Sequence, residues 1–216
     1  MWELILAGGP VMWPIIGCSI VSCAIIAERL WSLQPSRVAP AGVLERVSRL
    51  IAAGEVNDKH IGALEQNSPL GQILAAGLAQ RNRPREVVKE AIEDAGRHVA
   101  HELEQFLNML GTIASVSPLL GLLGTVVGII SAFNAITHGA AGDPRVLSGG
   151  IGQALIATAA GLCVAIPSLV AYRYLRGRID RLIIAMEKEA LGLIQALDEK
   201  RTEAEWIGDK RRRGSL

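Results

Sequence analysis

Two threonines, Thr125 and Thr158, stand near the middle of two long uncharged runs of the chain. A threonine hydroxyl does not titrate, but its proton and lone pairs can hold a carboxyl group or a chain of water molecules. On a helix, the hydroxyl can instead donate to a carbonyl oxygen of its own preceding turn. One threonine alone would favour that local bond. Two threonines at matching depth on antiparallel helices favour a shared polar path.

Small residues surround both threonines at helical spacing. Residues three and four apart share one face of a helix, and every position met in this way is small or is a proline. Small faces let helix backbones approach closely where lipid provides no hydrophobic drive. We therefore predict two packing faces, and packing alone would explain the glycines. They comprise Ala114, Pro118, Gly121, Gly128 and Ala132 around Thr125, with Gly124 in the same run, and Ala154, Gly161, Ala165 and Ser168 around Thr158.

Other side chains that could carry chemistry give weaker signals. His98 and His101 lie three residues apart beside Asp94 and Glu102, which imitates a metal site, but a solvated helix face explains them better. The sequence offers no nucleophile–base pair, phosphate loop or Cys/His ligand set, so we expect no enzyme activity, no metal and no cofactor. The net charge is close to zero and gives no sign of nucleic acid binding. The basic residues 210–213 could touch anionic membrane lipid, although a solvated tail is the simpler explanation.

Three uncharged runs dominate the chain, because no Asp, Glu, Lys or Arg occurs in residues 4–27, 105–142 or 146–172. A helix needs about 20 mostly apolar residues to span the hydrocarbon core of a bilayer. Soluble domains seldom hold three uncharged runs of this length, so buried helices of a soluble protein are the weaker explanation. We predict an all-α integral membrane protein with transmembrane helices at residues 9–30, 109–136 and 151–174.

Arginines decide the predicted orientation, because basic residues gather on the cytoplasmic side of membrane proteins. Four follow the first span and four follow the third, whereas the N-terminus has none and the loop between the second and third spans has only Arg145. The N-terminus and that loop are therefore expected outside. The resulting regions are an outer N-terminus at 1–8, a cytoplasmic helical region at 31–108, an outer loop at 137–150, and a cytoplasmic C-terminal helix with a basic tail at 175–216.

The cytoplasmic region is predicted to be helical, with short helices near residues 43–53 and 70–81. Apolar residues then recur every three or four positions, which indicates an amphipathic helix. Since no proline or glycine pair interrupts the pattern before the second span, we predict one continuous helix over residues 85–136. A similar stripe continues the third span, and the two long helices should pack on each other. The stripes are Val88, Ile92, Ala95, Val99, Leu103, Phe106 and Leu110, and Leu175, Ile179, Leu182, Met186, Ala190, Ile194 and Leu197.

The two threonine segments, "SPLLGLLGTVVGIISAF" at 117–133 and "IGQALIATAAGLCVAIPSLVAY" at 151–172, resemble the signature segments of the MotA/TolQ/ExbB proton-channel family. The opening "GGPVMWPIIGCSIVSCAIIAERLW" at 8–31 is similar to the first span of the ExbB and TolQ branch. The flagellar stator branch has four spans and fits less well. The match covers nearly the whole chain, in order.

This resemblance implies a bacterial inner-membrane homopentamer around a central pore, with the outer side being the periplasm. The pore would enclose two copies of a single-span partner, ExbD or TolR. Protons would be the coupling ion, and their flow would energise TonB or TolA, which reach the outer membrane. The threonines that match Thr125 and Thr158 line the pore in this family, opposite an aspartate of the partner. The sequence does not distinguish the TonB system from the Tol system.

Gln153 departs from the family pattern, because well-known relatives carry a glutamate at the matching position. Five residues separate it from Thr158, which turns it about 140° away from the threonine face of a helix. We therefore expect Gln153 to make a polar contact with a neighbouring helix or subunit and not to line the pore. With Gln153 uncharged, the second and third spans hold no acidic residue.

Two functions from different classes remain open at this point. The first is a proton-channel subunit that uses the proton motive force together with its partners. The second is a non-conducting membrane scaffold that stabilises and clusters single-span proteins. Both would use the small faces, but only a channel requires the two threonines at one depth.

Overall fold

A computed structural model describes residues 5, 7–137 and 144–213, and the fold of these residues is helical throughout. Short turns join the helices, several of which begin at a proline or end at a glycine. The helices are α2 (Met12–Ser32), α3 (Pro35–Val38), α4 (Val43–Ala53), α5 (Asp58–Glu65), α6 (Pro69–Ala79), α7 (Arg85–Glu104), α8 (Leu107–Thr137) and α9 (Pro144–Arg213).

Three helical stretches within the described residues are long and apolar enough to cross a membrane. The helices α2, α8 and α9, to which these stretches belong, contain the three predicted spans, apart from the first residues of the first span, which precede the start of α2 at Met12. The third span differs in its start, because α9 already begins at Pro144, within the predicted loop. Proline suits a first helical position, where its missing N–H costs nothing. The rest of that predicted loop, at 138–143, lies outside the described residues.

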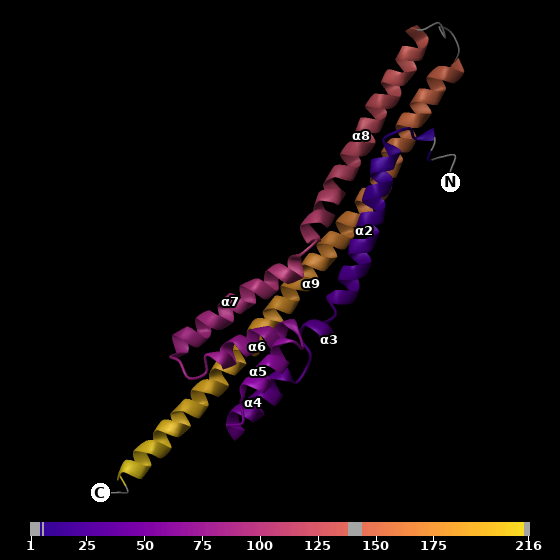
Figure 1. Ribbon diagram of the computed structural model, residues 1–216. Coiled ribbons are helices and arrows are strands. Elements are labelled where there is room, and N and C mark those ends of the chain that lie inside the picture. The colour runs from indigo at the N-terminus through magenta and orange to yellow at the C-terminus, as the bar shows by residue number, and fades with distance from the viewer. Residues whose placement is uncertain (1–4, 6, 138–143, 214–216) are drawn as a thin grey trace. The chain divides into compact units, whose positions relative to one another are not determined.

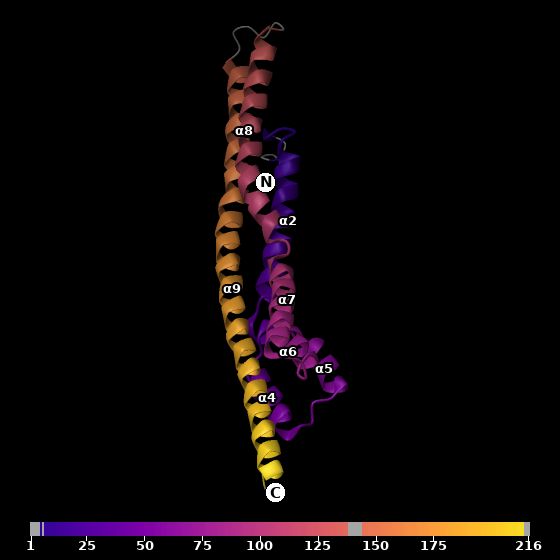
Figure 2. The ribbon, with the colours of Figure 1, turned by 90° about the vertical axis from the view of Figure 1, so that its left-hand side faces the viewer.

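The chain divides into two compact units, and the first, here called the membrane unit, consists of Met1–Leu30 and Phe106–Arg176. Its described part contains α2, α8 and the first part of α9, which lie side by side (Figures 1 and 2). Large apolar side chains of all three helices point outwards, among them Trp13, Leu122 and Ile166. An apolar exterior around a tightly packed interior fits a lipid environment or further protein partners.

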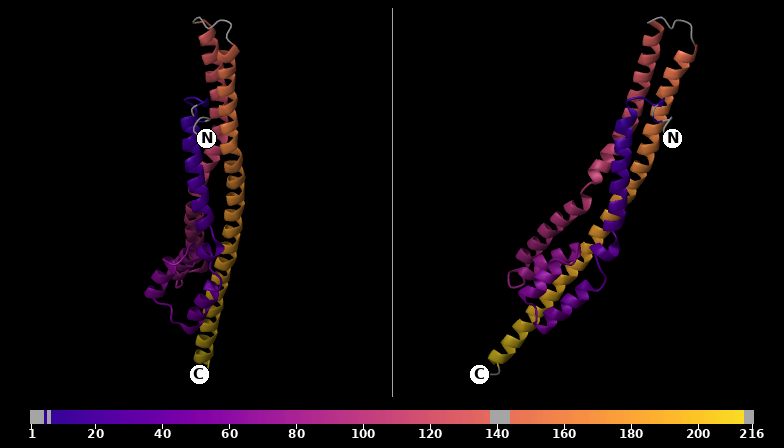
Figure 3. Two further views of the ribbon diagram at one scale, coloured as in Figure 1. Left: turned by 90° about the vertical axis from the view of Figure 1, so that its right-hand side faces the viewer. Right: turned by 45° about the vertical axis from the view of Figure 1, so that its right-hand side comes forward.

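The second unit consists of Trp31–Gln105 and Gly177–Leu216. Here α7, α6 and the later part of α9 pack together (Figure 3). Gly77 of α6 makes this possible, because a Cβ at that position would lie 2.8 Å from Ile92 of α7 and 2.9 Å from Leu193 of α9. The apolar stripe predicted for α9 is buried at each of its seven positions, which confirms the predicted amphipathic pattern.

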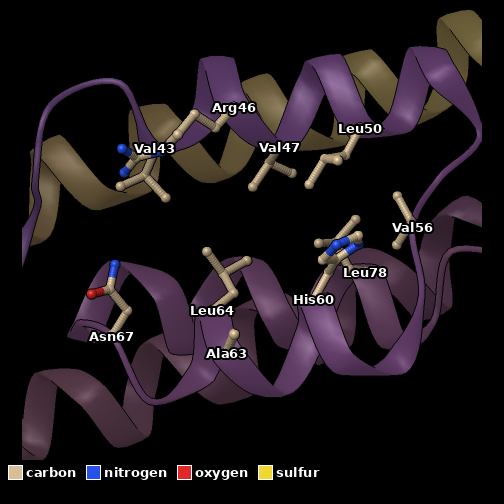
Figure 4. Close-up of a pocket in the computed structure, with 10 residues that line it drawn as sticks. All are labelled: Val43, Arg46, Val47, Leu50, Val56, His60, Ala63, Leu64, Asn67 and Leu78. Atoms are coloured by element: carbon tan, nitrogen blue, oxygen red, sulfur yellow. The ribbon is translucent and has the colours of Figure 1, made fainter.

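An open groove of about 330 Å³ separates α4 from α5 in the second unit (Figure 4). The sequence analysis missed α5, whose N-terminus is capped by the Asn57 side chain accepting from the His60 backbone N–H. The imidazole Nδ1 of His60 lies 3.0 Å from the Glu55 carbonyl oxygen, so a neutral ring would donate there. Apolar side chains dominate the groove, which is lined by Val43, Arg46, Val47, Leu50, Val56, His60, Ala63, Leu64, Asn67 and Leu78.

The predicted continuous helix over residues 85–136 is wrong, because the chain breaks between α7 and α8. Gln105 leaves the helical conformation, and Phe106 has a positive φ of 64°. A non-glycine residue in this left-handed region is held there by its surroundings. The guanidinium of Arg29, a residue only 6% exposed, lies 5.1 Å from the centre of the Phe106 ring. The apolar pattern could not reveal the break, because Phe106 continues it.

Candidate functional site

The small faces of α8 and α9 meet at backbone distance in the membrane unit. A Cβ at Gly161 would lie 2.6 Å from the Ser117 carbonyl oxygen, and one at Gly128 would lie 2.8 Å from the Gly150 carbonyl oxygen. One at Gly121 would lie 3.0 Å from the Cα of Thr158. No side chain fits between the two helices at these points, so glycine is required by the close approach.

The structure places the predicted packing residues as follows. Gly121, Gly124, Gly128, Ala154, Gly161 and Ala165 are buried, and Pro118 is half-buried. The sequence analysis did not single out Ser117, which is 0% exposed and whose carbonyl oxygen faces Gly161. The Ser117 hydroxyl donates to the Ile113 carbonyl oxygen at 2.7 Å. The spacing of four residues between Ser117 and Gly121 could have indicated this residue. The predicted small face included Pro118 and left Ser117 out.

Thr125 and Thr158, here called the threonine pair, bind two successive carbonyl groups of α8. The Thr125 hydroxyl donates to the Leu122 carbonyl oxygen at 2.6 Å, within its own helix. The Thr158 hydroxyl crosses from α9 and donates to the Gly121 carbonyl oxygen at 3.1 Å. Because adjacent carbonyls receive both bonds, the two hydroxyls lie at one depth and close together.

Both threonines also lie on the same side of the α8–α9 contact. At about 100° per residue, Thr125 is turned about 40° from Gly121, and Thr158 about 60° from Gly161, in the same rotational sense. Since the helices run antiparallel and face each other, equal senses of rotation point to one side of the pair. Several exposed leucines flank the threonines there, including Leu122 and Leu155.

The residues that directly precede α2 lie on the opposite side of the α8–α9 contact. A Cβ at Gly8 would lie 3.3 Å from Ile156 of α9, and one at Gly124 of α8 would lie 3.8 Å from Val11, which directly precedes α2. Gln153 belongs to this opposite side, because it is turned about 80° from Gly161 in the other sense. A Cβ at Gly9 would overlap the Gln153 carboxamide, so the two residues are in close contact.

Gln153→Ala is expected to lower the stability of the membrane unit by roughly 1 kcal/mol, since it removes a half-buried side chain from its contact with Gly9. Proton flux per assembled complex should change little, because Gln153 points away from the threonine pair. Thermal unfolding in detergent and flux measurements in liposomes would test this. Gln153→Glu, which keeps the size of the side chain, serves as the control and should be tolerated. Loss of flux with intact assembly in Gln153→Ala would contradict this placement.

Comparison with known proteins shows the family of this chain. The sequence pattern of the MotA/TolQ/ExbB proton channel family matches residues 65–188, which include α8, the start of α9 and the threonine pair. The chain belongs to this family. Within it, the ExbB/TolQ branch is indicated by the relatives below, and the three apolar helical stretches agree with that branch.

Three relatives illustrate the similarity. Biopolymer transport protein exbB1 of Vibrio cholerae is 32% identical over 186 residues, which cover 83% of this chain and 80% of the relative. Tol-Pal system protein TolQ of Haemophilus influenzae is 32% identical over 183 residues, covering 77% and 78% of the two chains. Biopolymer transport protein ExbB of Neisseria meningitidis serogroup B is 36% identical over 171 residues, covering 73% and 76%.

Proposed function

We propose that this chain is the ring-forming subunit of a proton channel in the bacterial inner membrane. It would use the proton motive force, with an ExbD- or TolR-like single-span partner, to energise a TonB- or TolA-like protein that acts at the outer membrane. Protons are the coupling ion, and no cofactor is needed. The observation that carries this proposal is the threonine pair, which lies at one depth and on one side of the α8–α9 contact.

The assembly follows from the exposed surfaces. The side that carries the threonine pair is apolar and lies opposite the residues that precede α2, so further chains are needed to enclose a polar path there. A closed ring of identical subunits is the simplest arrangement, and family resemblance suggests five. The N-terminus would be periplasmic and the C-terminus cytoplasmic, in agreement with the arginine distribution.

The proton itself requires a group from outside this chain. A proton cannot cross hydrocarbon as an isolated charge, because a charged group at mid-membrane is very costly. Within residues 105–142 and 146–172 the chain has no Asp, Glu, Lys or Arg. We therefore assign the proton-carrying carboxyl group to the span of the partner, which the threonine pair would face.

A second candidate is a non-conducting scaffold that clusters single-span proteins. The observation that favours it is that both hydroxyls already bond to backbone carbonyls, as purely structural threonines do. A scaffold would nevertheless not need both bonds at one depth.

The flux experiment separates the two candidates. The chain would be expressed together with an ExbD- or TolR-like single-span protein, and native mass spectrometry would first verify a cyclic oligomer. We expect liposomes that contain both proteins to conduct protons, and liposomes that contain this chain alone to conduct at the background rate. Assembled complexes without flux would favour the scaffold, and rapid flux without the partner would contradict the assignment of the carboxyl group. Mainly monomeric protein in mild detergent would contradict the ring.

A further inference from the structure

We propose that the threonine pair presents hydrogen-bond acceptors, and no donors, to the polar path, so that it selects the protonated form of the partner's carboxyl group. This inference rests on the proposed function and adds the protonation state in which the partner is held. It concerns the direction of two hydrogen bonds, which the structure fixes.

The donor in both hydrogen bonds must be the threonine, because a carbonyl oxygen has no proton to give. The Thr125 hydroxyl uses its proton on Leu122, and the Thr158 hydroxyl uses its proton on Gly121. A hydroxyl has one proton and two lone pairs. Each threonine therefore keeps only lone pairs, which can accept a bond from an O–H group but repel the lone pairs of a carboxylate.

The surroundings of the threonine pair also favour the protonated form of the partner's carboxyl group. Leu122, Ile129, Leu155 and Leu162 are exposed on this side of α8 and α9 and are all apolar. An apolar environment disfavours the charged form of a carboxyl group. The sequence of the two spans provides no lysine or arginine to compensate a negative charge. Backbone N–H groups within α8 and α9 are engaged in helical hydrogen bonds, so they offer no alternative donors.

A definite order of events follows for the proton. The partner's carboxylate takes up a proton from water before it reaches the pair, and the resulting O–H group then donates to the oxygen of Thr125 or Thr158. The proton stays on the carboxyl group while it is held. It is released to water only after the partner has moved away, where water can solvate the anion. Hydroxyls with free protons would produce the opposite preference, for the anion.

The bond directions can be tested on the ring without any partner. The chain would be labelled with ¹³C at glycine carbonyls, and the isotope-shifted amide I band compared between the wild type and Thr158→Val. Loss of the bond to Gly121 should move one component of this band to higher frequency. Thr112→Val is the matched control, because the Thr112 hydroxyl donates to the carbonyl of Asn108, which is not a glycine. An unchanged glycine band in Thr158→Val would overturn the proposal.

The preference itself is tested on the complex with the single-span partner, labelled with ¹³C at its aspartate carboxyl groups. We expect the carboxyl C=O stretch of the protonated acid to move to higher frequency in the Thr125→Val/Thr158→Val variant, because the acid has lost its acceptor. The pH midpoint of the same band should move downwards. A midpoint that moves upwards, or does not move, would overturn the proposal. Such a midpoint, found together with partner-dependent flux in the wild type, would refute this inference and leave the proposed function intact. Absence of flux in the wild type would refute the proposed function itself.

Discussion

The double variant Thr125→Val/Thr158→Val is expected to show a partner-dependent proton flux at least about tenfold lower than that of the wild type, while its ring stays assembled. Valine keeps the shape of threonine but cannot form hydrogen bonds. One lost hydrogen bond to a buried carboxyl group corresponds to about 1.5 kcal/mol, and about 1.4 kcal/mol corresponds to a factor of ten. Flux in liposomes and native mass spectrometry would be measured on the same preparations.

Thr112→Val provides the control for this experiment. It removes a threonine hydroxyl from the same helix, and that hydroxyl also donates to a carbonyl of its own preceding turn, at 2.9 Å. Residue 112 lies more than three helical turns from residue 125, so flux should remain at the wild-type level. Full flux in the double variant would refute the role of the pair. Disassembly of its ring would show instead that the bond from Thr158 to Gly121 is mainly structural.

The second large effect is expected for Gly161→Ala. The added Cβ would lie 2.6 Å from the Ser117 carbonyl oxygen and 3.1 Å from the Cα of Gly121. Both neighbours are backbone atoms, so no side-chain rotation can relieve the overlap, and the helices must move apart. Overpacking of this kind costs about 1–3 kcal/mol, and it would also weaken the bond from Thr158 to Gly121. Thermal unfolding in detergent should show a clearly lower midpoint.

Gly152→Ala is the matched comparison on the same helix. A Cβ at Gly152 meets no heavy atom within 4 Å, so its introduction creates no overlap. Alanine also favours a helix over glycine by up to about 1 kcal/mol. The stability of this variant should equal or exceed that of the wild type. Equal stability of Gly161→Ala and Gly152→Ala would mean that α8 and α9 are not in backbone contact at Ser117.

Residue patterns predicted the membrane unit well, because lipid leaves few choices. Uncharged length predicted three apolar helical stretches, and glycines of α8 and α9 lie where the two backbones approach each other. The direction of the threonine hydrogen bonds could not be predicted, since a hydroxyl at mid-membrane can bond within its helix or across to another. The structure contains one bond of each kind.

The stripe on α9, the break at Phe106 and helix α5 show where sequence patterns succeed and where they fail. The stripe on α9 was predicted because seven apolar residues keep one helical period over several turns. The break at Phe106 has no such signal, because glycine and proline are absent there and the apolar period continues through it. The contact that accompanies the break is tertiary, since the guanidinium of buried Arg29 from α2 lies 5.1 Å from the centre of the Phe106 ring. Helix α5 was missed because its eight residues are too few to establish a period.

The break at Phe106 also divides the protection of the backbone against hydrogen exchange. The first turn of a helix leaves its N–H groups without acceptors in the same helix, and the first bond of α8 runs from the Leu110 N–H to the Phe106 carbonyl oxygen. Local opening of α7 can therefore stop at this point without propagating into the membrane-spanning helix. α9 keeps the helical conformation through all of its 70 residues, Pro167 included, so opening within it meets no comparable break. The segment made of α7 and α8 and the single helix α9 thus differ in how far a local opening can spread along the chain.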